Sequence, residues 1–319
     1  MKRALVIGYD PDHDNHDAIA LGRLLASMLA ARPIVAAVLP WATNLTARSD
    51  LDRQLKLAMQ QRFKVIEDEL ARLEPETVAV AGSRPAAALH EVALANEASV
   101  IVLGSAHRGP VGRTLLGSVG ESCIHAAPTA VAIAPSGYAT RQPRKAHELA
   151  VAFDGSAESW TALESGIGLA DRCHARLSVL SVADPPRYGY GSAWTLISTG
   201  ELQDAERDEK RRLAEVGLAR IPEAMRGGGR LLSGEPGRRL ADASDRFDLM
   251  IAGSRGYGPL RRTLLGSATR GLIAASHSPV IVLPRGAGLD PLGVRAAPDS
   301  VAATPTGWAP ASDGTPTGA

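Results

Sequence analysis

The chain has few cysteines, few aromatic residues and almost no net charge. Its 319 residues include two cysteines, 4% aromatic residues and a formal net charge of +1. Cys123 and Cys173 form neither a Cys-x2-Cys pair nor a metal-ligand spacing, so we expect free thiols in a reducing compartment. A net charge this close to zero provides no global field that would point to nucleic acid or an acidic membrane as a partner.

Long apolar runs and common catalytic signatures are also missing. No apolar stretch approaches membrane-spanning length. Lys2-Arg3 leads directly into Ala4–Gly8, which is too short for the apolar part of a secretory leader and reads as a first strand. We therefore expect a cytoplasmic protein. The chain has no Walker-type Gly-Lys-Ser/Thr, no Gly-x-Ser-x-Gly and no His-Glu-x2-His, so we expect no catalytic residue and at most slow ATP hydrolysis.

What the chain does contain is a repeated glycine-rich segment. Gly104–Ser118 and Gly253–Ser267 are near copies, and Gly253 follows Gly104 by 149 positions. Each copy follows an apolar run that reads as a strand, and each opens a helical segment. Such a loop can bind anions because its backbone N–H groups are free and the helix dipole favours negative charge. The repeat predicts two copies of one α/β unit and two candidate phosphate sites.

Short aliphatic runs alternate with helical patterns in the same order twice, which predicts a parallel, doubly wound sheet in each half. In the first half, the expected strands are 3–9, 34–38, 76–81, 99–103 and 129–133, and the expected helices are 14–30, 49–73, 85–97 and 117–126. In the second half, the expected strands are 148–153, 176–183, 230–233, 248–252 and 279–283, and the expected helices are 157–172, 197–220, 236–246 and 266–276. The predicted domains are residues 1–135 (unit one) and 147–285 (unit two), with a linker at 136–146 and a disordered tail at 286–319, rich in Ala, Pro, Gly and Thr.

Acidic residues end the first strand of each unit, and the glycine loops follow the fourth. Open α/β sheets bind ligands at the carboxyl ends of their strands, where the winding reverses. If the first and fourth strands are neighbours, Asp10 faces Gly104 and Asp154 faces Gly253. A carboxylate there suits ribose hydroxyls and the loop suits phosphates. These positions alone indicate a nucleotide site.

The segment Gly253-x2-Gly256-x9-Gly266-Ser267 resembles the ATP-binding motif of the universal stress protein family. Val151–Ser156, Ser178–Pro186 and Ser278–Val282 resemble the family's first, second and last strands. The likeness covers roughly residues 1–135 and 147–285. It implies two tandem Rossmann-like domains of the adenine nucleotide alpha hydrolase type, each a five-stranded parallel α/β sandwich. Family units pair through their last strands, so the resemblance implies an intramolecular pseudo-dimer, with a further homodimer left open.

The resemblance also implies site residues. In unit two, Asp154 would meet the ribose, Val182 the adenine, and the loop the phosphates. The phosphate-binding residues would be Gly253, Ser254, Gly256, Gly266 and Ser267. Ser267 is expected at the N-cap of the following helix, and a plain cap without a ligand is the alternative. Arg255, Arg261 and Arg262 are open to two interpretations, as phosphate partners or as solvated surface arginines.

The counterparts in unit one are Asp10, Val38, Gly104, Gly117 and Ser118. Here His107 stands where the second motif glycine is expected, and Pro11 follows the carboxylate. We expect His107 to obstruct the phosphate loop, so that unit one binds weakly or stays empty. In the alternative, the protonated ring faces outward and pairs with the phosphate.

The sequence thus predicts a regulator that binds ATP, with or without Mg²⁺, and acts on an unidentified protein partner. Two alternatives remain open: an enzyme of the same superfamily that splits ATP between the α and β phosphates, and a nucleotide-free dimerisation module. A cluster near His13 and His16 has potential metal ligands in Asp10, Asp12, Asp14 and Asp17. We interpret it as a polar turn that caps the next helix, and we expect no metal there.

Overall fold

The computed structural model describes most of the chain. The described residues are 3–11, 16–39, 49–108, 114–125, 127–141, 145–184, 199–254, 265–285 and 290–294. These ranges leave out Gly256 and the loop arginines Arg255, Arg261 and Arg262. They also leave out the predicted tail apart from residues 290–294. For His107, only the backbone is described.

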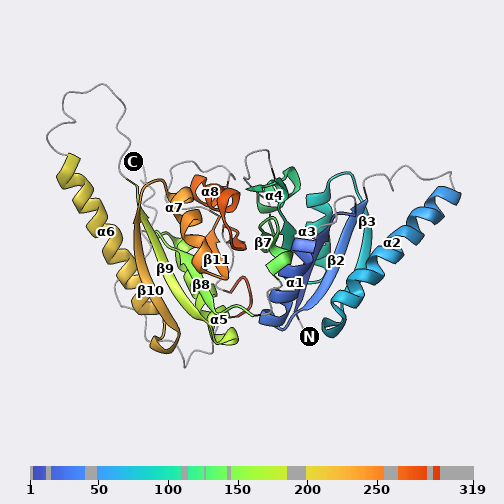
Figure 1. Ribbon diagram of the computed structural model, residues 1–319, viewed down its shortest axis with the longest axis horizontal. Coiled ribbons are helices and arrows are strands. Elements are labelled where there is room, and N and C mark those ends of the chain that lie inside the picture. The colour runs from blue at the N-terminus through green and yellow to red at the C-terminus, as the bar shows by residue number, and fades with distance from the viewer. Residues whose placement is uncertain are drawn as a thin grey trace, which may run out of the picture.

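The two units repeat one order of elements (Figure 1). Unit one contains β1 (Ala4–Tyr9), α1 (His16–Leu29), β2 (Arg32–Leu39), α2 (Ser49–Glu69), β3 (Glu76–Ala81), α3 (Pro85–Ala95), β4 (Ala98–Gly104), β5 (Ala106–Arg108), β6 (Thr114–Leu115), α4 (Ser118–His125) and β7 (Ala130–Ala134). Unit two contains β8 (Glu148–Ala152), α5 (Ala157–Cys173), β9 (Arg176–Ala183), α6 (Thr199–Arg220), β10 (Arg226–Ser233), α7 (Pro236–Ala243), β11 (Leu249–Gly253), α8 (Ser267–Ala275) and β12 (Val280–Leu283).

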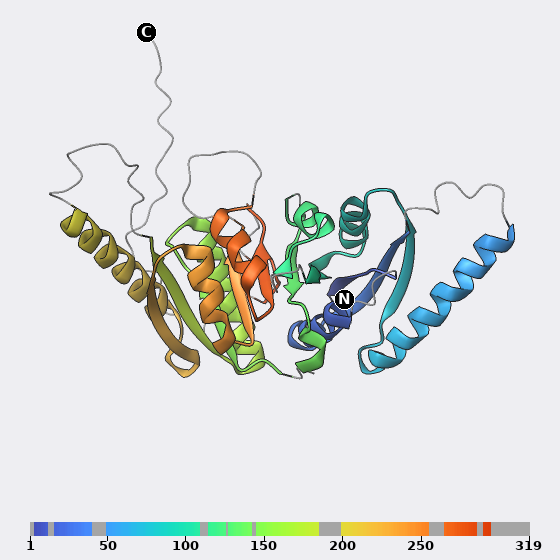
Figure 2. The same ribbon diagram turned by 45° about the horizontal axis from the view of Figure 1, so that its top comes forward.

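All the long strands belong to one ten-stranded sheet, in the order β10-β9-β8-β11-β12-β7-β4-β1-β2-β3. Within each unit the paired strands of this sheet are parallel, and the first strand lies between the second and the fourth. The predicted α/β class is therefore confirmed, and the first and fourth strands of each unit are neighbours, which is the condition on which the expected nucleotide site depends. The long helices α2 and α6 flank the two ends of the molecule (Figures 1 and 2).

The two units join through their last strands. β7 and β12 pair in antiparallel orientation, in the register Val131–Val282, Ala132–Ile281 and Ile133–Val280. Ala132 and Ile281 are 149 positions apart, the same offset as the two glycine motifs, so the central pair joins equivalent positions. This register is the one expected of a pseudo-two-fold axis, and the internal pairing implied by the resemblance is present.

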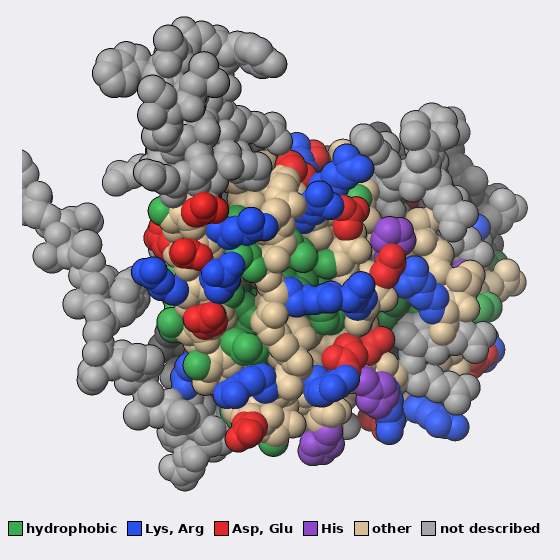
Figure 3. All heavy atoms as spheres, turned by 60° about the vertical axis from the view of Figure 1, so that its left-hand side comes forward, with side chains coloured by type: hydrophobic (Ala, Val, Ile, Leu, Met, Phe, Trp, Pro, Cys, Tyr) green, Lys and Arg blue, Asp and Glu red, His purple; other side chains and the backbone are tan. Residues whose placement is uncertain are grey.

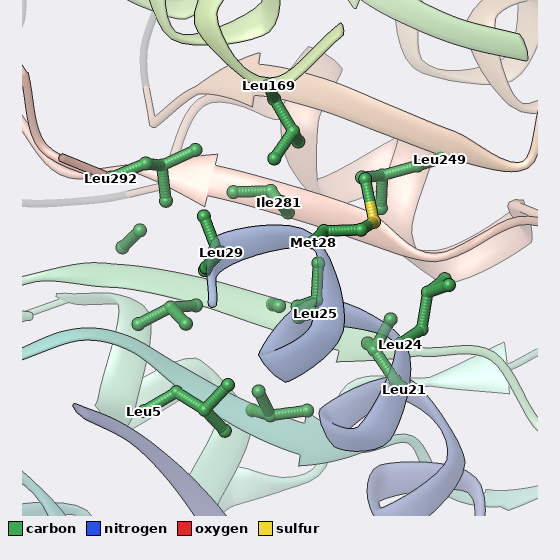
Figure 4. Close-up of a cluster of buried hydrophobic side chains, with 14 of the residues drawn as sticks. Leu5, Leu21, Leu24, Leu25, Met28, Leu29, Leu169, Leu249, Ile281 and Leu292 are labelled. Carbon is green, nitrogen blue, oxygen red and sulfur yellow. The ribbon is translucent and has the colours of Figure 1, made fainter. Parts of the chain in front are cut away.

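The strands are aliphatic because helices cover both faces of the sheet. α1, α2, α5 and α6 contribute to the core on one face, and α3, α4, α7 and α8 to the core on the other. Leu5, Leu149 and Ile281 are fully buried on the first face. Figure 4 shows Ile281 among Leu25 and Leu29 of α1 and Leu169 of α5, so one continuous core spans both units. Burying each such side chain contributes about 1.5–3 kcal/mol.

The linker is structured at its centre. Tyr138–Arg141 form a 3₁₀ turn, labelled η3, and the Tyr138 side chain is buried. The Asp17 carboxylate accepts hydrogen bonds from the N–H groups of Gly137 (2.9 Å) and Ala139 (2.7 Å), which ties the turn to α1. On the other side, the Arg141 guanidinium donates to the carbonyl of His277 at 2.6 Å. The linker is thus held by both units.

Part of the predicted tail also packs on the fold. Leu292 and Val294 are buried, and the Arg3 guanidinium donates to the carbonyl of Leu292 at 3.2 Å. Figure 4 places Leu292 near Leu29 of unit one and Leu169 of unit two. The expectation of disorder from residue 286 therefore does not hold for residues 290–294, because these two apolar side chains close the core where the units meet.

Two boundaries differ by four residues from the sequence expectations, and one loop contains an unexpected pair of strands. β10 begins at Arg226 rather than at residue 230, because Gly228 and Gly229 run in register beside β9. α2 ends at Glu69 and a separate 3₁₀ turn follows. The glycine loop of unit one contains the short antiparallel pair of β5 and β6, which no pattern in the sequence indicated.

No helix in the described part of the chain is long and apolar enough to cross a membrane. Figure 3 shows the face that carries α6 and β10, where Lys and Arg are interspersed with Asp and Glu. This mixture agrees with the small net charge of the sequence.

Candidate functional site

In unit two, the carboxyl ends of three neighbouring strands bring the predicted residues together. β8 pairs with β11 on one side and with β9 on the other. Asp154 follows β8, Val182 lies near the end of β9, and Gly253 ends β11. Asp154 and Val182 are half-buried, whereas Gly253 and Ser254 are buried. Asp154, Val182 and Gly253 therefore lie at the same carboxyl end of the sheet, where its winding reverses.

The two ends of the glycine loop are hydrogen-bonded to each other. The N–H of Gly266 donates to the carbonyl of Ser254 at 2.9 Å, and the Thr269 hydroxyl donates to the carbonyl of Gly253 at 2.8 Å. The N–H of Ser254 in turn donates to the carbonyl of Leu283 in β12, at 2.8 Å. These bonds hold the start of α8 against the end of β11, so the predicted phosphate residues at both ends of the loop are adjacent.

The cap of α8 differs from the expectation. Gly266 is the N-cap residue and Ser267 is the first residue of the helix, with no side-chain cap hydrogen bond. The prediction that Ser267 caps α8 is therefore wrong. Gly266 has the extended backbone conformation of a cap residue (φ −59°, ψ 146°), so the cap lies one position before the serine. The Ser267 side chain is exposed at the helix N-terminus, where an anion is favoured.

Asp154 lies in a small hydrogen-bonded turn. Its Oδ1 accepts from the N–H of Ser156 at 3.0 Å and from the Ser156 hydroxyl at 2.5 Å. The Ser156 oxygen also accepts from the N–H of Ser159 and so caps α5. The Lys210 ammonium from α6 donates to the backbone carbonyl of Asp154 at 3.4 Å. This network fixes the carboxylate at the strand end and brings a cation close to it.

Two charged residues near Gly253 were not anticipated from the sequence. A Cβ on Gly253 would lie 2.7 Å from the Cβ of Glu158, so glycine is required here by the close approach of α5. Glu158 also forms an ion pair with Arg285, at 3.4 Å. The sequence signal was weak, because one acidic residue in a first helical turn is common. Packing against α5 therefore explains Gly253 independently of any phosphate.

In unit one, the corresponding residues also lie at neighbouring strand ends. Asp10 follows β1, Val38 lies near the end of β2, and Gly104 ends β4. Gly117 precedes α4 and Ser118 begins it, with its side chain exposed. The N–H of Glu121 donates to the carbonyl of Gly117 at 2.9 Å.

The two glycine loops differ. The backbone of His107 lies in β5, in extended conformation, so it does not adopt the positive φ that a second motif glycine permits. Position 120 in unit one is glycine where unit two has Thr269, so the hydroxyl bond that ties α8 to β11 has no counterpart. Leu116 fills this space instead, because a Cβ on Gly120 would lie 2.8 Å from its Cδ1.

A surface groove of about 390 Å³ opens between the N-terminal ends of α3 and α4. It is lined by Ser83, Arg84, Pro85, Ala86, Ala87, His90, Ser118, Val119 and Ser122. In unit two the corresponding helices touch backbone to backbone, since a Cβ on Gly237 would lie 2.8 Å from the Cα of Gly271. Glu235 also caps α7, accepting from the N–H groups of Gly237 and Arg238. The groove therefore belongs to unit one and adjoins its predicted phosphate residue Ser118.

The acidic cluster near His16 is used structurally where it is described. His16 Nδ1 lies 3.4 Å from a Glu69 carboxylate oxygen, and Asp17 holds the linker as described above. Residues 12–15 lie outside the described residues. Among the described ranges, no group of three or more His, Cys, Asp or Glu side chains could hold a metal ion. Burial raises the thiol pKa of Cys123 to about 12 and of Cys173 to about 11, which disfavours reactive thiolates.

Comparison with known proteins gives one consistent result. The universal stress protein family matches residues 1–135 and 146–284. A universal stress protein of Mycobacterium tuberculosis H37Rv is 31% identical over 199 residues, which is 60% of this chain and 63% of the relative. One from Mycolicibacterium smegmatis is 26% identical over 237 residues, or 71% of this chain and 75% of the relative. The chain thus spans less than two thirds of the first relative's length.

Solved structures show the same fold. The crystal structure of a universal stress protein from Archaeoglobus fulgidus aligns with a TM-score of 0.60 at 22% identity and covers 89% of this chain and 98% of that one. A putative universal stress protein from Pseudomonas aeruginosa aligns with the same TM-score at 13% identity, covering 89% and 93%.

Proposed function

This chain belongs to the universal stress protein family, and we propose that it binds ATP in unit two and acts as a nucleotide-dependent regulator of a stress response. The observation that carries this proposal is the hydrogen bonding between the two ends of the glycine loop. The bond between Gly266 and Ser254 places the N-terminus of α8 at the end of β11, beside the strand that leads to Asp154.

Each part of an adenine nucleotide has a counterpart at this edge. The phosphates suit the helix N-terminus at Gly266 and Ser267, where backbone N–H groups and the helix dipole favour anions. The ribose hydroxyls suit the Asp154 carboxylate, which accepts hydrogen bonds. The half-buried Val182 offers the adenine an apolar contact. Lys210, which reaches the Asp154 backbone, adds positive charge close to the site.

A regulatory role fits these residues better than fast catalysis. In the described part of the site, the Ser156 hydroxyl donates to the Asp154 carboxylate, but this serine is buried and caps α5, and the sequence has no Walker lysine. We therefore propose that bound ATP orders the glycine loop and changes a surface that a protein partner recognises. Mg²⁺ would accompany the phosphates through phosphate oxygens rather than through a protein metal cluster. The proposal places the protein in the cytoplasm, where ATP is available.

A direct experiment tests the proposal. The purified full-length chain is extracted with acid and its nucleotides are identified by chromatography, and ATP is then titrated into the nucleotide-free protein by calorimetry, with and without Mg²⁺. Gly256→Val adds a branched side chain where the backbone must approach phosphate. We expect ATP affinity to fall at least tenfold, ~1.4 kcal/mol.

The control is Gly228→Val in the edge strand β10. A Cβ at that position meets nothing within 4 Å, and valine suits a strand. This variant should bind ATP like the parent chain. No bound nucleotide and no titration heat would favour the nucleotide-free module, and rapid release of pyrophosphate would favour the enzyme.

A further inference from the structure

The two units present unlike surfaces to each other at equivalent positions. α4 and α8 lie on the same face of the sheet near the β7–β12 pair (Figure 1). Glu121 is the fourth residue of α4 and Arg270 is the fourth residue of α8. A carboxylate oxygen of Glu121 lies 3.4 Å from Nη1 of Arg270. These positions are equivalent in the two units. If unit one paired with a second copy of unit one, Glu would therefore face Glu. If unit two paired with a second copy of unit two, Arg would face Arg.

The strand pair at the axis shows the same complementarity in size. Ala132 lies directly opposite Ile281, and both side chains are fully buried on the α1 and α5 face. A pair made of two copies of unit one would place alanine opposite alanine and leave a void under α1. A pair made of two copies of unit two would place isoleucine opposite isoleucine and overfill the same space. Voids and overpacking both destabilise a core.

A third difference between the units lies where the chain leaves the last strand. Residues 290–294 continue from unit two, yet Arg3 of unit one donates to the carbonyl of Leu292. Val294 packs against α5 so closely that a Cβ on Gly168 would lie 2.2 Å from the Val294 carbonyl oxygen. This segment therefore contacts both units across the axis. The chain leaving β7 also contacts both units, but as the linker and through different residues, so the two exits are not equivalent.

We propose that the joining surface of each unit is complementary to the other unit and not to a copy of itself, in charge at Glu121 and Arg270 and in size at Ala132 and Ile281. The partner of unit one is unit two, and pairing of like units between chains is disfavoured. The linker, held by Asp17 on one side and by the Arg141–His277 contact on the other, keeps this unlike pair within one chain.

The first test is a charge exchange in the full-length chain. Glu121→Arg and Arg270→Glu each bring like charges together, and each should lower the folding equilibrium constant about threefold to tenfold at low salt. The double exchange restores opposite charges and should return to within about twofold of the parent. Glu91→Arg combined with Arg270→Glu is the matched control, because exposed Glu91 lies on α3 and this double variant keeps the same net charge without restoring the pair.

Denaturant unfolding at low and high salt measures these constants. Recovery in the Glu121/Arg270 exchange but not in the control supports the proposal. A double exchange that falls by the product of the two single effects overturns the charge part. The size part is tested in the same way with Ala132→Ile and Ile281→Ala. The folding equilibrium constant of the double variant should be at least about tenfold higher than the value given by multiplying the two single effects.

The second test reads the partner directly and does not depend on stability. Glu121→Cys and Arg270→Cys are treated with a short bis-maleimide, alone and combined. The combined variant should form a cross-link within one chain, and neither single variant should give covalent dimers. Cys123 and Cys173 contribute little background, because burial raises both thiol pKa values. Efficient dimer formation by either single variant would show that like units pair and would overturn the proposal.

Discussion

The two units share one topology but differ where two helices meet at the phosphate end of the sheet. In unit two, α7 and α8 touch through Gly237 and Gly271, and no side chain separates their backbones. In unit one, α3 and α4 have Ala86 and Ser122 at the corresponding positions, and a groove lies between their N-termini. The same fold therefore accepts a closed or an open helix contact, because the strands beneath fix both helices independently of it.

The residue that precedes the first of these two helices also differs in charge between the units. In unit two, the N-terminus of α7 is already capped by the Glu235 carboxylate, which accepts two backbone N–H groups. In unit one, the residue before α3 is Arg84, whose side chain forms no cap. Unit two therefore satisfies the N-terminus of α7 internally, and the N-terminus of α8 is the one that we propose for the phosphates. Unit two thus has the tighter helix framework, and its sequence also keeps the full glycine motif.

The largest expected effect comes from opening the closed helix contact. Gly237→Val places a side chain against the Cα of Gly271 and the carbonyl oxygen of Ala268, at 2.8 and 2.9 Å from the new Cβ, so backbone must move. We expect a loss of about 3 kcal/mol in the free energy of unfolding. Ala86→Val, the matched change beside the groove, should cost less than about 1 kcal/mol. Urea denaturation measures both, and equal losses would show that the helix contacts do not differ in tightness.

The next effect concerns the bond that unit one lacks. Thr269→Val removes the hydroxyl that donates to the buried carbonyl of Gly253. Leaving that acceptor unpaired should cost about 2 kcal/mol of stability and weaken ATP binding in unit two. The half-buried Thr161, whose hydroxyl makes a solvent-exposed hydrogen bond to the carbonyl of Ala157 within α5, is the control, and Thr161→Val should change little. Unfolding and ATP titration of both variants decide the point.

A smaller effect is expected from making the unit-one motif more like that of unit two. His107→Gly restores a glycine at the second motif position, and we expect ATP stoichiometry at neutral pH to rise from about one toward two per chain. An affinity gain of tenfold at that site corresponds to ~1.4 kcal/mol. Calorimetry measures the stoichiometry. Two equivalent sites in the parent chain would contradict an obstructing histidine, and binding that strengthens as pH falls through about 6.5 would favour its protonated role.

The smallest effect is a difference in thiol reactivity between the units. Burial raises the pKa of Cys123 to about 12 and that of Cys173, partly offset by Arg172, to about 11. Only the thiolate reacts, so alkylation at pH 8 should be slow at both, and slower at the fully buried Cys123 in unit one than at the half-buried Cys173. Each rate should rise about tenfold per pH unit below the thiol pKa. Mass spectrometry after timed alkylation of the native chain gives the two rates.

The sequence predicted most of the architecture because its signals were periodic and doubled. Aliphatic runs located the strands, and the 149-residue offset placed Gly104 and Gly253 in matching positions. The last-strand pairing came from the family resemblance, and the register of Ala132 with Ile281 agrees with it. The expected site required the first and fourth strands to be neighbours, and the strand order places Asp154 and Gly253 at adjacent strand ends.

Features that depend on tertiary contacts were missed. A serine at a helix start suggested a cap at Ser267, but the backbone places the cap at Gly266. The need for glycine at 253 arises from Glu158, which lies on a different element. The three glycines at 227–229 hid the first half of β10, because glycine favours no strand by itself. Roles in nucleotide binding at Gly256 and at the arginines of the loop stay predictions.

The short segment at 290–294 changes where the folded body should be considered to end. The family match stops at residue 284, so an alignment would suggest that anything beyond it can be trimmed. A chain cut at 285 would nevertheless lose Leu292 and Val294, and it would uncover apolar side chains of α1 and α5 in both halves at once. Trimming at the alignment boundary is therefore expected to yield a less soluble protein, with the defect lying at the junction rather than at the cut end.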